Sequence, residues 1–344
     1  MRYPKFLPAG GTIGFPAPSC GCATEPYSTT FDHALKKFES MGFRTQPGPN
    51  ARLGRGIGIS NDPESCAREF MDMYLSGDTD CLISCGGGEL MCEILPYMDF
   101  EKLTQAAPKW FMGYSDNTNL TLLLATLADT ASVYGPCAAS FFMEPLHASL
   151  NDAIEILTGK RKSVSSYGLW EKESLKDAEH PLVPYNLTEK LAMQCFVGRE
   201  EVSHAQFQGR LLGGCLDILA NLVGTRFDRV REFVERYKED GIIWFLEACD
   251  LNVFSIRRAM WQLEEAGWFR YVKGFLIGRP ANGEPMMNLD HKNAVLEVAG
   301  RKNVPVVLDA DLGHKPPMMP LIVGSMAEVT YGGSEQLTVE MKLS

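Results

Sequence analysis

The first half of the chain alternates short apolar runs with segments that carry apolar residues at helical spacing. Strands that alternate with helices predict a parallel sheet joined by right-handed crossovers and flanked by the helices. We therefore expect an N-terminal α/β domain. The runs that predict strands are 11–16, 80–85 and 109–113, and the segments that predict helices are 31–43, 62–77, 89–100 and 119–129.

The second half has its own apolar runs and helical segments and predicts a mixed α/β domain, with 327–333 and 336–343 forming a closing antiparallel hairpin. Between the halves, residues 163–201 are richer in charge, proline and helix breakers, so we place the connection near the start of this segment. The expected domains are 1–165 and 166–344. The further predicted strands are 209–214, 241–248, 272–280 and 304–309, and the predicted helices are 215–224 and 252–269.

Composition excludes two classes of partner. A chain of 344 residues exceeds the size at which one core usually stops growing, which favours two domains. With 43 acidic against 33 basic residues the net charge is −10, which argues against nucleic acid. No run approaches the ~20 apolar residues that span a bilayer, and the N-terminus lacks an apolar signal region, so we expect a cytoplasmic protein without membrane contact.

Several of the ten cysteines fall in apolar runs, where a free thiol behaves as a small hydrophobic group. We expect most of them to be reduced and buried. The close pairs Cys20/Cys22 and Cys81/Cys85 lack the paired C-x-x-C spacing of a zinc site, so the sequence predicts no metal.

Ser115 follows the apolar run 109–113 and precedes a helical segment. A serine in this position is commonly a helix N-cap. It also lies at the carboxyl end of a predicted parallel strand, where open α/β sheets bind ligands, and near a helix N-terminus that favours negative charge. Gly113 permits a sharp turn, although Asn117 stands where a G-x-S-x-G nucleophile elbow has its second glycine. The residues alone leave both interpretations open.

Three glycines, Gly86 to Gly88, separate another predicted strand from a helix. They fit a tight turn, and glycine-rich turns also begin phosphate sites, but neither the G-x-G-x-x-G nor the Walker pattern is present. A third interpretation is an oxyanion hole in which backbone N–H groups of this turn act beside Ser115, together with the N–H of Asp116.

A serine nucleophile needs a base and an acid. His314 lies in a loop rich in glycine and proline, where solvated histidines are common, and the other five histidines have ordinary contexts. Glu247 ends the apolar run 242–246, as a polar strand edge also would. The positions are compatible with a Ser, His and Glu set but do not require it.

Several blocks together resemble the serine peptidase family that contains LD-carboxypeptidases and microcin C immunity hydrolases. They are "AGGTIGFPAPS", "FMGYSDNTNLTLLL", "GRLLGGCLDILANLVGT", "WFLEACDLN" and "DLGHKPPMMPLIVG". The resemblance implies that Ser115 is the nucleophile, Glu247 the acid and His314 the base, with Gly87 and the Asp116 N–H as the oxyanion hole. It also implies amide hydrolysis without metal or organic cofactor, and a homodimer.

The substrate that the resemblance implies is either a murein tetrapeptide, cut between an L-diamino acid and a terminal D-alanine, or an aminoacyl or peptidyl nucleotide amide. The turn "GGGEL", in which Glu89 follows the glycines, lacks the tyrosine of the carboxypeptidase-type "GGYG" turn, which speaks against a murein substrate. The block "GYSDNTN" favours the second branch. We expect Gly86, Gly88, Glu89 and Arg279 to contact substrate. Arg257 and Arg258 are further candidates for binding a carboxylate, and Trp170 for stacking on a base.

Two other classes of protein compete with a serine hydrolase. A non-catalytic protein could use the same turns to bind a small molecule, and Ser115→Ala would then leave its function intact. A cysteine-dependent amidohydrolase would be sensitive to thiol alkylation, but no cysteine occupies the turn at Ser115.

Overall fold

The structure is a computed structural model that describes residues 1–343. It divides into two compact units, Met1–Arg161 with Glu173–Asn186, and Lys162–Lys172 with the chain from Leu187 onward. The single boundary expected after residue 165 thus differs from the observed division, which falls at Arg161 and returns 173–186 to the first unit. The Lys176 ammonium explains part of this return, because it lies over the rings of Tyr27 and Phe142 at 5.6 and 5.3 Å.

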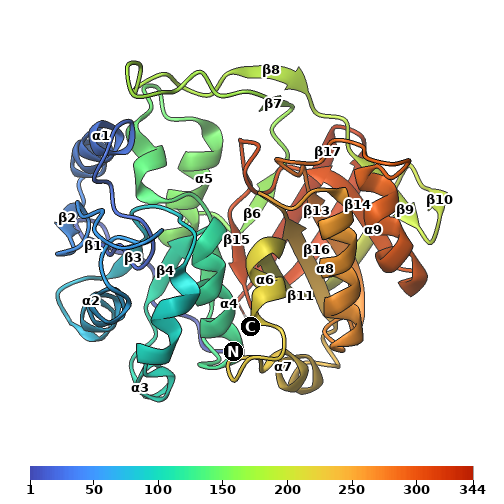
Figure 1. Cartoon of the computed structure of the whole chain (residues 1–344), viewed down its shortest axis with the longest axis horizontal. Coiled ribbons are helices and arrows are strands. Elements are labelled where there is room, and N and C mark those ends of the chain that lie inside the picture. The colour runs from blue at the N-terminus through green and yellow to red at the C-terminus, as the bar shows by residue number, and fades with distance from the viewer. Residues whose placement is uncertain (344) are drawn as a thin grey trace. The chain divides into compact units, whose positions relative to one another are not determined.

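The first unit contains a parallel sheet with the strand order β5-β4-β3-β1-β2, drawn in blue to green in Figure 1. The inner strands β1, β3 and β4, together with β5, are apolar and wholly buried beneath the helices, whereas the edge strand β2 carries polar, partly exposed residues. The strands are β1 (Thr12–Phe15), β2 (Arg44–Pro47), β3 (Cys81–Ile83), β4 (Trp110–Gly113) and β5 (Ser132–Tyr134).

The predicted helical segments 31–43, 62–77 and 119–129 overlap α1, α2 and α4, whereas η3 and α5 were not predicted. A side-chain cap explains the start of α2. The Asp62 side chain accepts a hydrogen bond from the Ser65 N–H, and Pro63 occupies the first helical position of α2. Residues 89–100 predict one helix but form η1 and α3, because Pro96 interrupts regular helical hydrogen bonding. The helices are α1 (Tyr27–Ser40), α2 (Pro63–Leu75), η1 (Met91–Tyr97), α3 (Phe100–Gln105), η2 (Ser115–Asn117), α4 (Thr118–Thr126), η3 (Ala138–Phe142) and α5 (Ala148–Leu157).

Helix α4 is buried along its whole length. A helix that is covered on every side needs no polar face, and the segment Leu120–Ala125 is accordingly apolar except for Thr121. The helix therefore forms a fixed support directly behind the Ser115 turn.

The second unit contains a nine-stranded sheet with the order β10-β9-β14-β13-β12-β11-β16-β17-β6. Strands β11 to β14 pair in parallel and the other neighbours are antiparallel, including the predicted hairpin of β16 and β17, which is confirmed. The strands are β6 (Ser163–Ser165), β9 (Gln194–Val197), β10 (Glu200–Glu201), β11 (Ala205–Cys215), β12 (Ile242–Glu247), β13 (Val272–Gly278), β14 (Pro305–Ala310), β16 (Met326–Gly333) and β17 (Gln336–Lys342).

The remaining elements of this unit are helices and three short strands. The Asn252 side chain caps α8 by accepting a hydrogen bond from the Ser255 N–H. Strands β7 (Leu169–Glu171) and β8 (Leu187–Lys190) pair with each other, and β15 spans Leu321–Val323. The parallel first unit and mixed second unit confirm the expected fold class. The helices are α6 (Leu216–Leu222), α7 (Val230–Arg236), α8 (Val253–Glu265), α9 (His291–Ala299) and η4 (Gly300–Lys302).

Candidate active site

Ser115 occupies a strained turn between β4 and α4. Its φ of +62° is left-handed, a conformation that costs a residue with a side chain about 1–2 kcal/mol. Helix N-caps normally have extended dihedral angles, and the cap positions belong to Tyr114 and Asn117, neither of which caps with its side chain. Ser115 is therefore not a helix cap, and its turn is typical of a nucleophile held on a strand-to-helix elbow.

The glycine turn lies against this elbow because β3 and β4 are parallel neighbours, whose carboxyl ends meet at one edge of the sheet. The Asn117 amide nitrogen joins the two turns by donating to the carbonyls of Gly86 and Tyr114, at 2.9 and 3.0 Å. A Cβ at Gly87 would lie 3.1 Å from the Ser115 Cβ and 3.2 Å from its Oγ. Glycine at this position therefore lets a backbone segment pass close to the serine hydroxyl.

The buried carboxyl group of Asp116 holds the turn at Ser115 through hydrogen bonds to neighbouring segments. Its Oδ2 accepts hydrogen bonds from the Ser19 hydroxyl at 2.6 Å and the Met91 N–H at 3.0 Å, and its Oδ1 accepts one from Asn119 at 3.1 Å. Burial raises the pKa of Asp116 to about 6, although the bonds from Ser19 and Met91 favour the ionised form. Sequence reasoning missed Ser19, since a single hydroxyl in a proline-rich loop carries no pattern.

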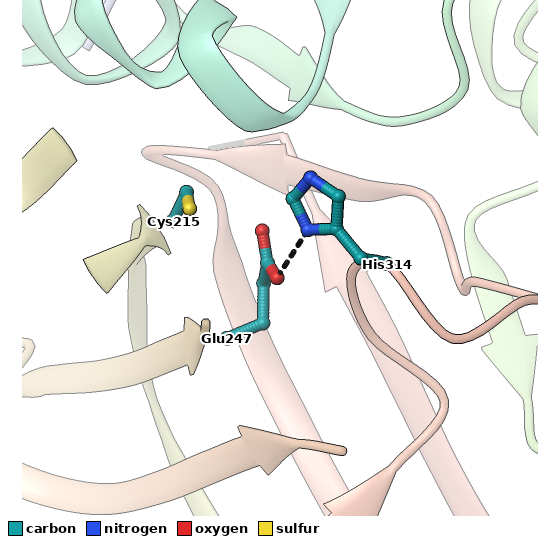
Figure 2. Close-up of side chains that lie close together, drawn as sticks. All are labelled: Cys215, Glu247 and His314. Atoms are coloured by element: carbon teal, nitrogen blue, oxygen red, sulfur yellow. Dashed lines mark hydrogen bonds and ion pairs between the residues drawn. The ribbon is translucent and has the colours of Figure 1, made fainter. Parts of the chain in front are cut away.

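In the second unit, Glu247 and His314 form a hydrogen-bonded pair, drawn in Figure 2. The Glu247 Oε2 and the His314 Nδ1 are 2.8 Å apart, and the Glu247 side chain is only 1% exposed. Glu247 is the last residue of β12, and His314 lies in the loop after β14. The loop carries Gly313 at a φ of +86°, and a Cβ there would lie 2.3 Å from the Glu247 Oε2. Glycine is therefore needed for His314 to reach the carboxylate.

The pair also sets the charge of the imidazole. Burial by itself lowers the pKa of His314, but attraction by Glu247 and contact with the Cys249 side chain hold it well above its ordinary value. A carboxylate at Nδ1 fixes the tautomer and orientation of a histidine and stabilises the imidazolium that forms when Nε2 takes a proton. The arrangement thus suits a general base supported by an acid.

Cys215 lies beside this pair and was not singled out by the sequence. It ends β11, which pairs with β12 so that Cys215 is directly opposite Glu247. Its Sγ lies 3.3 Å from Oδ2 of Asp217, and burial followed by the charges of Glu247 and Asp217 raises the pKa of the thiol well above its ordinary value. A thiol with a raised pKa is a poor nucleophile, so the structure gives no support to a cysteine-dependent hydrolase here.

Arg279 is buried, and its guanidinium forms an ion pair and hydrogen bonds within the protein. Its Nη2 bonds Asp311 Oδ1 at 2.6 Å, and its terminal nitrogens also donate to the carbonyls of Asp309 and Lys315, which bracket His314. Its guanidinium lies 4.9 Å from the ring centroid of Trp170. The expected contact of Arg279 with substrate stays a prediction, whereas its bonds assign it a role in holding the His314 loop.

A cavity of about 500 Å³ in the second unit lies beside this loop. Its lining carries five lysine and arginine side chains against three acidic ones, Glu284, Asp290 and Asp309. Such a cavity suits an anionic group. The cationic side chains are Lys172, Lys190, Arg279, Lys292 and Lys315, and Trp170 forms part of the wall.

The other residues that the sequence proposes as substrate contacts have partners of their own within the protein. Glu89 is exposed, and its N–H donates to the Gly58 carbonyl at 3.0 Å, while a Cβ at Gly88 would lie 2.2 Å from the Ser19 Oγ. Arg257 lies 3.7 Å from Glu297 and Arg258 bonds Ser255 at 2.9 Å, both at the surface of α8. The two arginines therefore have ordinary surface partners.

The predicted site residues thus fall into two groups. Ser115, Gly87 and Asp116 come together in the first unit, and Glu247 and His314 come together in the second.

Among residues 1–343, no helix is both long and apolar enough to cross a bilayer.

Comparison with known proteins gives concordant results for both halves. Residues 13–135 match the family model of the LD-carboxypeptidase N-terminal domain, and residues 208–329 match that of its C-terminal domain. The microcin C7 self-immunity protein MccF of Escherichia coli is 27% identical over 98% of this chain and 96% of its own. A probable murein peptide carboxypeptidase of Bacillus subtilis is 25% identical, over 94% of this chain and 90% of its own.

Solved structures agree on the fold. MccF in complex with aspartyl sulfamoyl adenosine superposes with a TM-score of 0.80 at 22% identity, over 99% of each chain. At this identity the likeness speaks for the fold alone. Since the two domain models of one family together match more than half of the chain in the expected order, this protein belongs to the LD-carboxypeptidase family of S66 peptidases.

Proposed function

We propose that this protein is a serine hydrolase that cleaves an amide bond with Ser115 as nucleophile, His314 as general base and Glu247 as its supporting acid. The observation that carries the proposal is the 2.8 Å bond between the Glu247 carboxylate and the His314 Nδ1. Family membership and the left-handed turn at Ser115 support it. This is the nucleophile, base and orienting acid of a triad, recognised by role rather than by chain order.

The proposed reaction has two steps. His314 Nε2 takes the hydroxyl proton as the Ser115 Oγ attacks the amide carbonyl, and the N–H groups of Gly87 and Asp116 donate to the oxyanion. In residues 1–343 no protein acceptor takes up the Gly87 N–H, which supports this assignment. His314 then gives its proton to the leaving amine. In the second step it deprotonates water, which releases the acyl group and restores Ser115.

The first candidate substrate is a murein tetrapeptide, from which the enzyme would release terminal D-alanine. The family and its murein peptide carboxypeptidase relative support this choice. D-alanine leaves with a free carboxylate, and the cationic cavity that includes Lys315, next to His314, fits such a group.

The second candidate is an aminoacyl nucleotide amide. MccF is an immunity protein and has been solved with aspartyl sulfamoyl adenosine and with glutamyl sulfamoyl guanosine, and its similarity to this chain extends over almost the full length of both. A negatively charged nucleotide fits the same cationic cavity.

The test measures covalent labelling and hydrolysis in the same variants. Intact-mass spectrometry after treatment with a fluorophosphonate probe should show one adduct on wild type and none on Ser115→Ala. His314→Gln should slow labelling at least ~10²-fold, since the probe reacts with a serine that loses its proton to a base. Mass spectrometry of a murein tetrapeptide and of aspartyl sulfamoyl adenosine, each incubated with the enzyme, then identifies the substrate.

Equal labelling of wild type and His314→Gln would contradict the proposed base, and labelling of Ser115→Ala would contradict the nucleophile. If neither substrate is cut and no adduct forms, but the wild type and Ser115→Ala bind either ligand equally, the protein is a non-catalytic binding protein.

The homodimer also stays a prediction. Light scattering coupled to gel filtration would detect a homodimer as twice the monomer mass.

A further inference from the structure

We propose that Cys215, Glu247 and His314 form a binding site for Zn²⁺, and that the ion inhibits the enzyme reversibly. The inhibitory part rests on the function proposed above, whereas metal binding does not. The site uses the last residues of two adjacent parallel strands, since Cys215 lies opposite Glu247 where β11 and β12 end. The third ligand comes from the loop after β14, and Figure 2 shows the three side chains together.

The donor atoms match the chemistry of zinc. One thiol sulfur, one carboxylate oxygen and one imidazole nitrogen all lie within 4.8 Å of one another. Zinc sites use these three donor types at about 2.0–2.3 Å from the metal, often with water as the fourth ligand. Closing around the ion therefore requires side-chain movements on the order of 1 Å. Magnesium and calcium prefer oxygen ligands, so a thiol and an imidazole select a softer metal.

Fixed groups around the site hold two of its ligands. The Asp217 carboxylate lies 3.3 Å from the Cys215 sulfur and accepts the N–H groups of Cys249, Asp250 and Leu251 at 3.0, 2.9 and 3.2 Å. Arg279 holds the backbone on both sides of His314. Such outer contacts orient ligands and strengthen metal binding. The two carboxylates, Glu247 and Asp217, also supply negative charge that favours a divalent cation.

Binding of zinc at this site removes the base from the proposed reaction. The ion takes the place of the hydrogen between the His314 Nδ1 and Glu247, and it displaces the thiol proton of Cys215 to solvent. The neutral imidazole then carries its proton on Nε2. Because this nitrogen can no longer accept the proton of Ser115, hydrolysis stops until a chelator removes the ion.

The binding experiment uses the full-length Ser115→Ala protein, in which hydrolysis plays no part. After removal of metals with EDTA, Co²⁺ should produce a thiolate-to-cobalt charge-transfer absorption, which Zn²⁺ then abolishes by displacement. The double variant Ser115→Ala with Cys215→Ser should lack this absorption. Cys249→Ser is the matched control, because that thiol also contacts His314, and it should keep the absorption. Loss with Cys249→Ser but not with Cys215→Ser would overturn the assignment, as would absence of the absorption.

The inhibition experiment uses protein with Ser115 intact. Zn²⁺ should inhibit hydrolysis of the substrate identified above, EDTA should restore the rate, and Cys215→Ser should keep its basal activity while its inhibition constant rises at least ~10-fold. Equal inhibition of Cys215→Ser and wild type, or an activity that requires Zn²⁺, would overturn the proposal. Cobalt absorption in a protein that hydrolyses neither substrate would leave the metal site standing and refute the hydrolase instead.

Discussion

Replacement of Glu247 by glutamine tests the central pair, because glutamine keeps the shape of the side chain and removes its charge. The partner atoms are 2.8 Å apart and Glu247 is 1% exposed, so solvent screens their interaction little. Loss of the anionic member of a serine triad lowers kcat by about 10⁴-fold, which is about 5 kcal/mol at 1.36 kcal/mol per tenfold. We therefore expect Glu247→Gln to fold and to lose most of its activity.

The same substitution should also shift the pH profile in a defined direction. In the wild type, kcat/KM should fall on the acid side when His314 takes up a proton, at a pKa that burial lowers but Glu247 holds well above the ordinary value. Without the carboxylate, burial prevails and the pKa of His314 falls. The acid limb of the profile should therefore move to lower pH while the plateau falls.

Steady-state hydrolysis between acid and alkaline pH measures both effects, with Glu328→Gln on β16 as the control. Glu328 is a surface carboxylate bound to Gln206 and Lys342, so its replacement should change neither the rate nor the profile. An unchanged kcat in Glu247→Gln, or an acid limb that stays in place, would refute the assignment of Glu247 as the supporting acid.

Four further predictions follow from the strained turn and the buried charges. Ser115→Gly should unfold with a free energy about 1 kcal/mol higher than Ser115→Ala, since glycine tolerates the φ of +62°, and equal urea denaturation midpoints would contradict this. The pKa of Asp116 is about 6 in the folded protein and 3.8 in the unfolded chain. Above pH 6 the buried carboxylate is ionised and lowers the free energy of unfolding. Below pH 6 the folded carboxyl takes up a proton, and this loss of stability becomes smaller. Wild type should therefore gain about 1.4 kcal/mol over Asp116→Asn between pH 7 and pH 5 in urea titrations, and a constant difference would refute the raised pKa. Arg279→Ala should cost about 3 kcal/mol of stability, against less than ~0.5 for the surface control Arg257→Ala. Arg279→Lys should lower kcat through a loosened His314 loop, whereas a raised KM at constant kcat would identify Arg279 as a substrate ligand.

Local sequence signals predict where Glu247 and Ser115 lie in the fold, because each signal spans only a few neighbouring residues. Glu247 does end the strand β12, and Ser115 does lie between β4 and α4. Their catalytic roles came from the family resemblance and stay a prediction. The left-handed φ of Ser115 has no such signal, since serine rarely adopts it and propensity favours a cap.

Long-range contacts explain the rest of the difference. The pairing of Cys215 with Glu247 depends on the register between two distant strands, which periodicity does not fix. Likewise, the charge-rich segment 173–186 has the composition of a linker, yet Lys176 and Tyr185 pack against aromatic and imidazole rings of the first unit. A structure was needed to find both features.

The division of the chain limits how it can be cut into working fragments. Because Glu173–Asn186 belongs to the first unit while its flanks belong to the second, the polypeptide passes from one unit to the other at three points. A fragment that stops at Arg161 leaves Tyr27 and Phe142 without the Lys176 side chain, and a fragment that starts at Lys162 carries a segment deprived of its packing surface. No single cut of the polypeptide, by recombination or by a protease, therefore separates the two units of this protein intact.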